Sequence, residues 1–320
     1  MTYSIDHNIP PLIPRLLPPL TQILSTYQQD PSILASLSIK LIRPIQFTQV
    51  LALASEDTLI QALRSPAPSA NILAIAVIEK AARSPSDTAI LSNMKGVVEN
   101  FLRTWLSSPH VEVGEKATKA LGDLLEVDSD RRSGAGIDVQ MNGMQLASRN
   151  PPGQGLLWRR VFQDREIYGL LFSLCSSQTV GNRDGELNER QKSLAQARLL
   201  RVLPRLAALD FQKISHTQFP GIEQRYDQQE RGLLYFAAVD MVNKEEDMLM
   251  HVTLIDFFSE FLDTMSTTEL TKPAMDYLGA LMKRATGSDV ALYKSLESLA
   301  LSPESSPELV DLLVKLSQYQ

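Results

Sequence analysis

The chain has 320 residues, of which 44% are hydrophobic and 21% charged, and its formal net charge is −6. This is an ordinary globular composition, and its acidic balance makes nucleic acid a poor default partner. The longest strictly apolar run, residues 72–78, is far shorter than the roughly 20 residues that cross a bilayer, and the polar, proline-rich N-terminus is unlike a secretion signal. The single cysteine, Cys175, excludes an internal disulfide framework and favours the cytoplasm, with the nucleus as a second compartment.

The first segment, residues 1–30, contains five prolines and predicts an irregular N-terminal cap with a short helix near 20–28. Asp30 and Pro31 then resemble an N-cap and a first helical residue. The helix that they start is expected to end at Arg43, before Pro44. Turn signals such as Ser-Pro pairs separate the next expected helices, which are 45–54, 56–64, 69–83, 87–106 and 109–127.

The segment 108–128 is the most informative part of the chain because it has the pattern of the second helix of an armadillo or HEAT repeat. Ser108 and Pro109 suit its start, and the residues expected on its buried face are Val113, Ala117, Ala120, Leu121, Leu124 and Leu125. A shift of 43 residues aligns Ser65 with Ser108 and brings Ala74, Val77, Ile78, Ala81 and Ala82 onto the same apolar positions. A period of this length is typical of HEAT and armadillo repeats.

Residues 128–155 lack helical periodicity and predict a long, mobile loop between repeats. The stretch 129–160 is rich in arginine, with Arg131, Arg132, Arg149, Arg159 and Arg160, which is compatible with nucleic-acid binding. No aromatic residue lies among the arginines of the loop, so a solvated linker is the favoured interpretation. Helices are then expected at 156–177 and 187–209, with Pro204 bending the second, and 211–224 is expected to be a connection.

The segment 232–262 predicts a helix, a short turn and a second helix. Asn243 and Glu246 have the spacing of a capping box at the start of that second helix. Its buried stripe is expected to contain Met248, Val252, Ile255, Phe258 and Leu262. The last helices are expected at 272–285, 289–301 and 306–318, and sustained period-two alternation is found nowhere, so no substantial sheet is expected.

These patterns predict an all-α protein, an α-solenoid of armadillo/HEAT-like helical repeats that spans residues 1–320 as one domain. A single amphipathic helix cannot bury its apolar stripe alone, so neighbouring repeats must stack on it. Such a fold indicates a binding scaffold and not an enzyme.

One face of the helix expected at 244–265 carries a row of carboxylates. Asp256, Glu260 and Asp263 are spaced i, i+4 and i+7, and Thr253 and Glu246 are expected on the same stripe. From Gly221 to the C-terminus the chain has 17 acidic and 8 basic residues, so this half could steer a basic protein surface. These five residues are the candidate partner-binding site, and the alternative is a plain solvated face.

No residue pattern predicts catalysis, a metal site or a cofactor. Cys175 lies in an apolar helical run and is expected to be a core thiol. The four histidines have no metal-ligand spacing with one another or with Cys175, and Gly153 and Gly155 follow no strand, so a phosphate site is weakly supported. A hydrolase on a helical fold would need a nucleophile beside a base, and the sequence indicates none.

The run Gly-Leu-Leu-Tyr-Phe-Ala-Ala-Val from Gly232, with Glu-Asp-Met-Leu-Met-His-Val-Thr-Leu-Ile-Asp-Phe-Phe from Glu246 and the 108–128 helix, resembles the proteasome non-ATPase regulatory subunit 5 family. Fungal members of this family are also labelled DNA mismatch repair proteins. The resemblance implies a curved HEAT-like solenoid that chaperones assembly of the base of the proteasome regulatory particle. Family members hold the C-terminal domain of one ATPase subunit and have no catalytic motif. They are usually longer than this chain, which suggests an N-terminal fragment or a short form.

The resulting hypothesis is an assembly chaperone of the 26S proteasome base. Its expected partners are the C-terminal domain of an AAA+ ATPase subunit, bound in a concave groove, and other base subunits, with no small-molecule substrate, no membrane and no direct nucleic-acid contact. The alternative is a generic armadillo or HEAT adaptor. An import adaptor is disfavoured because its groove helices carry repeated Trp and Asn, whereas this chain has only Trp105 and Trp158.

Overall fold

The computed structural model describes residues 15–16, 31–130, 152–176, 187–226, 231–287 and 289–318, and within them the backbone forms helices and no strands. The chain divides into two compact units, Met1–Val161 and Phe162–Gln320. The predicted fold class, an all-α solenoid of armadillo/HEAT-like repeats, is confirmed. In the described parts of the chain, no helix combines the length and the apolar character that crossing a membrane requires.

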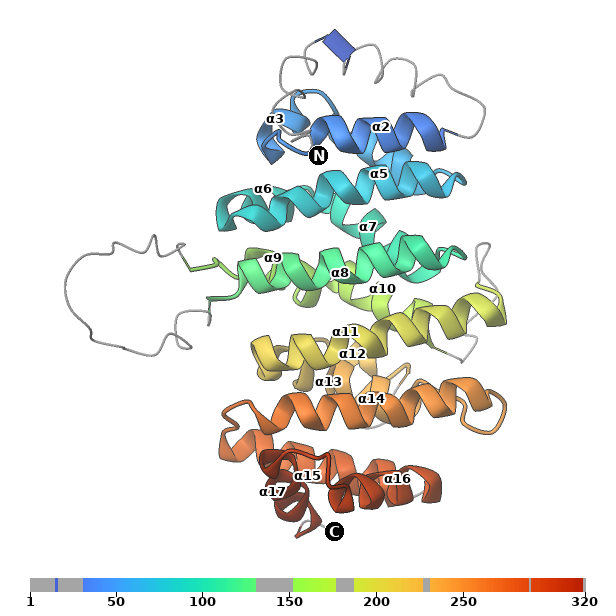
Figure 1. The fold of residues 1–320 in the computed structure, drawn as a ribbon, viewed down its shortest axis with the longest axis vertical. Coiled ribbons are helices and arrows are strands. Elements are labelled where there is room, and N and C mark those ends of the chain that lie inside the picture. Colours follow the sequence, from blue (N-terminus) through green and yellow to red (C-terminus); the bar gives the residue numbers. More distant parts are fainter. Residues whose placement is uncertain are drawn as a thin grey trace, which may run out of the picture. The chain divides into compact units, whose positions relative to one another are not determined.

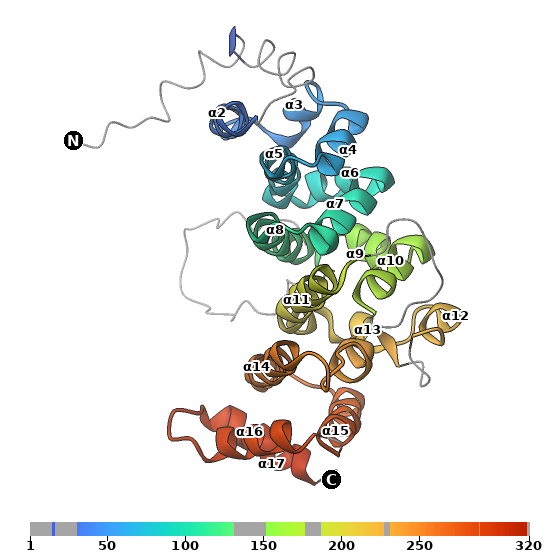
Figure 2. The ribbon, with the colours of Figure 1, turned by 90° about the vertical axis from the view of Figure 1, so that its right-hand side faces the viewer.

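In the first unit the helices form two layers. Helices α2, α5 and α8 lie side by side in one layer, and α4 packs against α7 in the other (Figures 1 and 2). The elements are α2 (Ser32–Ile42), α3 (Phe47–Leu51), α4 (Glu56–Arg64), α5 (Pro68–Glu79), the 3-10 turn η3 (Lys80–Arg83), α6 (Pro85–Asn93), α7 (Lys95–Ser107), α8 (Val111–Asp128) and α9 (Leu156–Phe162).

The 43-residue repeat is present in the structure. Helix α5 begins at Pro68 and α8 at Val111, while α4 ends at Arg64 and α7 at Ser107, so both pairs of helix ends are 43 residues apart. The aligned small residues Ala74 and Ala117 are both buried, 1% and 0% exposed, and the two helices that carry them are in contact. Small side chains let the two helix backbones approach each other, which explains why both repeats have alanine at this position.

The helix predicted at 87–106 is two helices, α6 and α7, and the single-helix prediction is wrong. The chain leaves the helical conformation at Met94, where φ is −84° and ψ is 69°. Just after this break, Gly96 lies against α4, and a Cβ there would be 3.0 Å from Cδ1 of Ile60. The turn therefore lets α7 pack closely beside α4. The sequence did not predict this break because no proline or glycine directly precedes Met94.

The ends of the predicted 128–155 loop are held together, although residues 131–151 lie outside the described residues, as does most of the predicted N-terminal cap. Asp128 is fully buried, and its carboxylate accepts hydrogen bonds from the amides of Leu156 (3.2 Å), Leu157 (2.7 Å) and Trp158 (3.0 Å). A Cβ at Gly153 would collide with the backbone of Asp128, so this position requires glycine. The last residue of α8 thus caps the first turn of α9.

In the second unit, the long helix α11 packs against α10, α13 and α14, and α14 packs against α16 and α17. Figure 2 shows α11 and α14 next to each other. The elements are α10 (Arg165–Cys175), α11 (Glu189–Ser215), α12 (Pro220–Glu223), α13 (Gly232–Tyr235), the π-helical turn η5 (Phe236–Asp240), α14 (Met248–Ser266), α15 (Lys272–Gly287), α16 (Val290–Leu301) and α17 (Pro307–Ser317).

Two helix boundaries that precede α12 differ from the prediction. The expected 156–177 helix is divided into α9 and α10, because Asp164 caps a new helix by accepting from the amides of Glu166 (3.1 Å) and Ile167 (3.4 Å). Helix α11 continues to Ser215 instead of ending near 209, and its kink lies at Asp210, where φ is −153° and ψ is 84°. The Asp210 carboxylate accepts from the amide of Lys213 (3.2 Å), so it caps the segment after the kink.

Candidate protein-binding surfaces

The three predicted carboxylates of α14, Asp256, Glu260 and Asp263, are all exposed, and together they form what is here named the acidic face. Among the described residues, no lysine or arginine forms an ion pair with them. Thr253 is half-buried, and its hydroxyl donates to the carbonyl oxygen of Leu249 (2.9 Å) within the same helix. The acidic face therefore presents unneutralised negative charge to solvent.

Glu246 does not lie on the acidic face, and the predicted capping box is wrong. Helix α14 begins at Met248, and its N-cap is Asp247, whose carboxylate accepts from the amide of Met250 (3.0 Å). Asp247 also accepts a hydrogen bond from the hydroxyl of Ser193 on α11 (2.7 Å). The Ser193 hydrogen bond, followed by that of the Met250 amide, lowers the pKa of Asp247. A partner from another helix thus decides which residue caps α14.

Glu246 instead belongs to the turn before the helix. Its carboxylate accepts from the side-chain amide of Asn243 (2.7 Å), and the oxygen of that amide accepts from the Glu246 backbone N–H (3.4 Å). Asn243 and Glu246 therefore bond to each other, as their spacing predicted, but they close the turn at 243–246 and do not cap the helix.

The predicted buried stripe of α14 is also corrected. Phe258 and Leu262 are buried as expected, but Met248 is 70% exposed and Val252 is 53% exposed. The side chains that pack inward are Met250, Leu254, Phe257, Phe258, Phe261, Leu262 and Met265. Together with the exposed Leu249, Met248 and Val252 give the start of α14 an apolar surface beside the turn.

A charged cluster joins the start of α14 to α16. The Asp289 carboxylate contacts Nε2 of His251 (2.8 Å) and Nζ of Lys244 (3.0 Å), and it accepts from the amide of Leu292 (3.0 Å) as the N-cap of α16. Burial opposes ionisation of Asp289, but the hydrogen bonds from Leu292, Lys244 and His251 outweigh it and lower its pKa. His251 is therefore a packing residue that ties two helices together.

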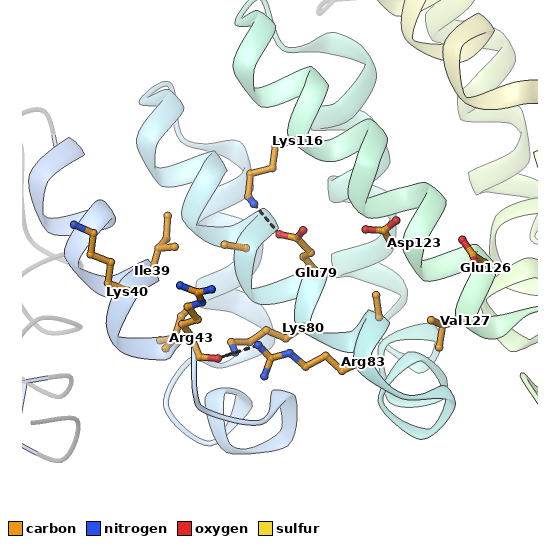
Figure 3. Close-up of a pocket in the computed structure, with 13 residues that line it drawn as sticks. Ile39, Lys40, Arg43, Glu79, Lys80, Arg83, Lys116, Asp123, Glu126 and Val127 are labelled. Atoms are coloured by element: carbon orange, nitrogen blue, oxygen red, sulfur yellow. Dashed lines mark hydrogen bonds and ion pairs between the residues drawn. The ribbon is translucent and has the colours of Figure 1, made fainter. Parts of the chain in front are cut away.

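A second surface lies on the first unit and was not found from the sequence. Side chains from α2, α5, η3 and α8 line an open groove of about 700 Å³, here named the charged groove (Figure 3). Its charged lining residues are Lys40, Arg43, Glu79, Lys80, Arg83, Lys116, Asp123 and Glu126, and its apolar ones are Ile39, Ile42, Ala76, Ala82 and Val127.

Two cations of the charged groove fasten α2 to η3. Nζ of Lys80 donates to the carbonyl oxygens of Arg43 (3.2 Å) and Ile45 (2.7 Å), and the Arg83 guanidinium donates to the carbonyl oxygen of Arg43 (2.9 Å). These carbonyls lie just past the end of α2, where the helix dipole favours positive charge. The lysine and arginine thus cap α2 from the next repeat.

Lys80 is 5% exposed, and its environment disfavours its charged form. Burial, and then repulsion by Arg83, lower the pKa of Lys80 to about 8, although Glu79 acts in the opposite direction.

An ion pair between Glu79 and Lys116 (2.7 Å) lies at the centre of the groove, and Lys119 also contacts Glu79 at 3.5 Å.

Cys175 and the two tryptophans are buried. Cys175 is fully buried, and burial raises the pKa of its thiol, so the predicted core thiol is confirmed. The indole N–H of Trp105 donates to the hydroxyl of Thr118 (2.8 Å) and that of Trp158 to the carbonyl of Leu125 (2.8 Å), which places both indoles in the core. Among the described residues, His, Cys, Asp and Glu form no group of three that could hold a metal ion.

Comparison with known proteins gives a family-model match for part of the first unit. Residues 2–113 match the family model described as the N-terminal domain of DNA mismatch repair protein HSM3. The matched residues 2–113 are here named the HSM3-type segment. The family predicted from the sequence is thereby confirmed, although the match lies largely upstream of the 108–128 and 232–262 segments on which the prediction was based. The described part of the HSM3-type segment ends in the first turn of α8 and contributes most of the residues that line the charged groove.

A search of curated proteins gives no match to the chain. Among solved structures, the chain is similar to a designed armadillo repeat protein in complex with the peptide (KR)4, at 10% sequence identity and a TM-score of 0.42. That similarity covers 95% of this chain and 99% of the designed chain.

Proposed function

We propose that this protein is an assembly chaperone for the base of the 26S proteasome regulatory particle, and that it holds the C-terminal domain of an AAA+ ATPase subunit. The observation that carries the proposal is the HSM3-type segment at residues 2–113, which agrees with the family resemblance of the 232–262 segment. The helical-repeat scaffold supports it, since stacked helices offer broad surfaces for a protein partner.

The proposed mechanism is occlusion. The helices of each unit are already packed, so little conformational entropy is lost when a partner binds. In the first unit, Lys80 and Arg83 hold α2 onto the following repeat, which keeps the layer of α2, α5 and α8 rigid before any partner arrives. A bound ATPase domain would be shielded from other base subunits until assembly proceeds, and this role needs no catalytic group or cofactor.

The acidic face of α14 is the proposed contact with a basic surface of the partner. Asp256, Glu260 and Asp263 are exposed, and Thr253 lies beside them on the same helix. Unpaired exposed charges increase the association rate and select the partner more than they add to affinity. Glu246, displaced into the turn before α14, would act as a flanking charge.

The first test is affinity purification of the tagged chain at mild salt, followed by mass spectrometry. The proposal expects recovery of proteasome base ATPases without the 20S core, which would indicate an assembly intermediate in the cytoplasm or nucleus. Recovery of other proteins without any proteasomal ATPase would reject the chaperone role and move the function to that of a general helical-repeat adaptor.

The second test concerns the acidic face. Asp256, Glu260 and Asp263 are replaced together by lysine, and affinity for the recovered ATPase C-terminal domain is measured by calorimetry. A matched control replaces three exposed carboxylates elsewhere in the same unit by lysine, namely Glu269, Glu297 and Glu304. The proposal expects weaker binding for the first variant alone, and equal affinity for both would show that the acidic face is only solvated surface.

A further inference from the structure

The solvent side of α14 carries exposed apolar side chains next to the acidic face. Met248, Leu249 and Val252 lie in its first two turns, and each is more than half exposed; together they are here named the apolar patch. With 3.6 residues per turn, the apolar patch and the acidic face fall within an arc of about 120° around the helix. Both therefore face solvent from the same side of α14, and one binding partner could cover them together.

The packing of α14 does not account for the apolar patch. Side chains on the opposite side of the helix, from Met250 to Met265, hold α14 in the core, and Asp247 caps its start. Elsewhere in this unit, Leu301 and Val314 are comparably exposed, but each is the only large apolar side chain exposed in its turn. Single exposed apolar residues are ordinary, whereas contiguous ones mark interaction sites.

Carboxylates border the apolar patch at both ends. Glu245 and Glu246 are exposed in the turn before α14, and the acidic face follows the patch along the helix. Among the described residues, no lysine or arginine forms an ion pair with these carboxylates. Lys244 and His251, which are the nearest basic residues in the sequence, both contact Asp289 instead. The surface is thus an apolar centre with unneutralised negative charge on either side.

This charge pattern selects among the possible occupants. A second copy of the chain would set carboxylates against carboxylates or against the apolar patch, and an anionic lipid surface would be repelled by the same charges. A partner with basic side chains on both sides of an apolar stripe is complementary throughout.

The backbone of α14 selects the conformation of that partner. Beyond the helix ends, its N–H and C=O groups bond within the helix, so its side offers no backbone partner to an extended segment. A helical segment satisfies its own backbone groups and can present an apolar stripe to another helix.

We propose that this side of α14 binds a basic amphipathic helix, with the apolar stripe of that helix on the apolar patch and its lysines or arginines over the carboxylates. The inference rests on the proposed function for the identity of the partner protein, and it deepens that function by naming the element that α14 recognises. Burial of the apolar patch would supply affinity, whereas the carboxylates would select a basic partner.

The test uses the full chain and synthetic peptides. One fluorescent peptide has leucines on one helical face and lysines on the others, a second has the same composition in an order without an apolar face, and a third has glutamate in place of lysine. Fluorescence anisotropy should show that the first peptide binds tightest, by about tenfold or more over either of the others.

Leu249→Ser with Val252→Ser removes most of the apolar patch and keeps every charge. It should weaken binding of the leucine–lysine peptide about tenfold or more, because the apolar stripe loses its contact. The matched control is Leu301→Ser with Val314→Ser, since these residues are 80% and 54% exposed, against 76% and 53% for Leu249 and Val252. The control should bind like the parent, and circular dichroism of both variants checks the helix content.

Equal affinities for the three peptides, or equal losses in the two double variants, would overturn the proposal. Sedimentation of the chain alone tests the second-copy alternative, because a dimer that Leu249→Ser with Val252→Ser disperses would assign the surface to self-association. Flotation with phosphatidylserine vesicles tests the lipid alternative in the same way, and binding that this variant abolishes would equally reject the proposal.

The same two variants are then measured against the recovered ATPase C-terminal domain. If the ATPase is recovered but Leu249→Ser with Val252→Ser binds it as tightly as the parent does, the inference fails and the chaperone role stands. If no ATPase is recovered while the peptide results hold, the chaperone role fails and the preference of α14 for basic amphipathic helices stands.

Discussion

Helices α8 and α14 have almost the same length, 18 and 19 residues, yet they bury their side chains in different ways. In α8 the apolar residues occupy one face, and the opposite face mixes acids with Lys116 and Lys119. In α14 apolar residues occur almost all around the first turns, and the exposed carboxylates have no cations among them. One helix is therefore specified by its own pattern, and the other by the helices that surround it.

The buried faces show this difference directly. For α8, each residue expected to be buried, from Val113 to Leu125, is 0–3% exposed. For α14, two of the five expected residues, Met248 and Val252, are largely exposed. When apolar residues exceed what one face can hold, periodicity no longer selects a face, and packing against α11, α16 and α17 decides.

The largest expected effect is on the repeat packing of α8. Ala117→Asp should lower the free energy of unfolding by about 3–5 kcal/mol, because it buries an unpaired carboxylate between α5 and α8. Chemical denaturation followed by circular dichroism measures this change. Val111→Asp introduces the same residue at an exposed position in the first turn of the same helix and should be nearly neutral. A midpoint for Ala117→Asp within error of the parent would contradict the repeat packing.

The next effect distinguishes the two interpretations of α14. Leu254→Ala should cost about 2–4 kcal/mol, because Leu254 is 1% exposed and its removal leaves a cavity. Val252→Ala, at a position 53% exposed, should change stability by less than about 0.5 kcal/mol. Thermal unfolding of both variants tests the corrected stripe, and the reverse order of effects would restore the stripe expected from the sequence.

The third prediction concerns the junction between α8 and α9. Asp128→Ala should cost about 2 kcal/mol, because three buried amides at the start of α9 lose their acceptor. Asp128→Asn keeps one acceptor oxygen and should cost less. Hydrogen exchange at Leu157 and Trp158 should quicken in the alanine variant, and unchanged protection would show that the cap does not hold α9 in place.

The smallest effect is a pH dependence from Lys80. Because its pKa is lowered in the folded state to about 8, the unfolded chain binds the proton more tightly between pH 8 and the ordinary lysine pKa of 10.5. The contribution of Lys80 to stability should therefore rise with pH in this window, by about 1 kcal/mol between pH 8 and pH 9. Comparison of unfolding in the parent and in Lys80→Met measures it, and parallel pH profiles would show that Lys80 has an ordinary pKa when folded.

The sequence predicted local features better than those that need a neighbour. Helix α4 was placed correctly because Ser55 is followed by a polar, amphipathic segment that ends before Ser65. The break at Met94 was missed because it depends on the contact that α7 makes with α4. The kink at Asp210 was missed because the Asp210 side chain caps the segment that follows it. The exposure of Asp256, Glu260 and Asp263 followed from helical spacing alone.

The charged groove was missed although its register is present in the sequence. Lys40, Arg83 and Glu126 each resemble an ordinary solvated charge, and only the 43-residue shift brings them to equivalent positions. Apolar residues at equivalent positions define how the repeats pack, whereas charged residues at equivalent positions define a surface. Only the packed helices bring these charges into one groove.

The sequence by itself determined the helical class of this protein, the Ser-Pro junctions of its first unit and the register of α5 with α8. These features depend on interactions within a few residues or on a single apolar face. The tertiary structure alone decided the rotation of α14, the choice of Asp247 as its cap and the assembly of the charged groove. Each of these requires side chains from separate helices, and their positions are known only once the helices have packed.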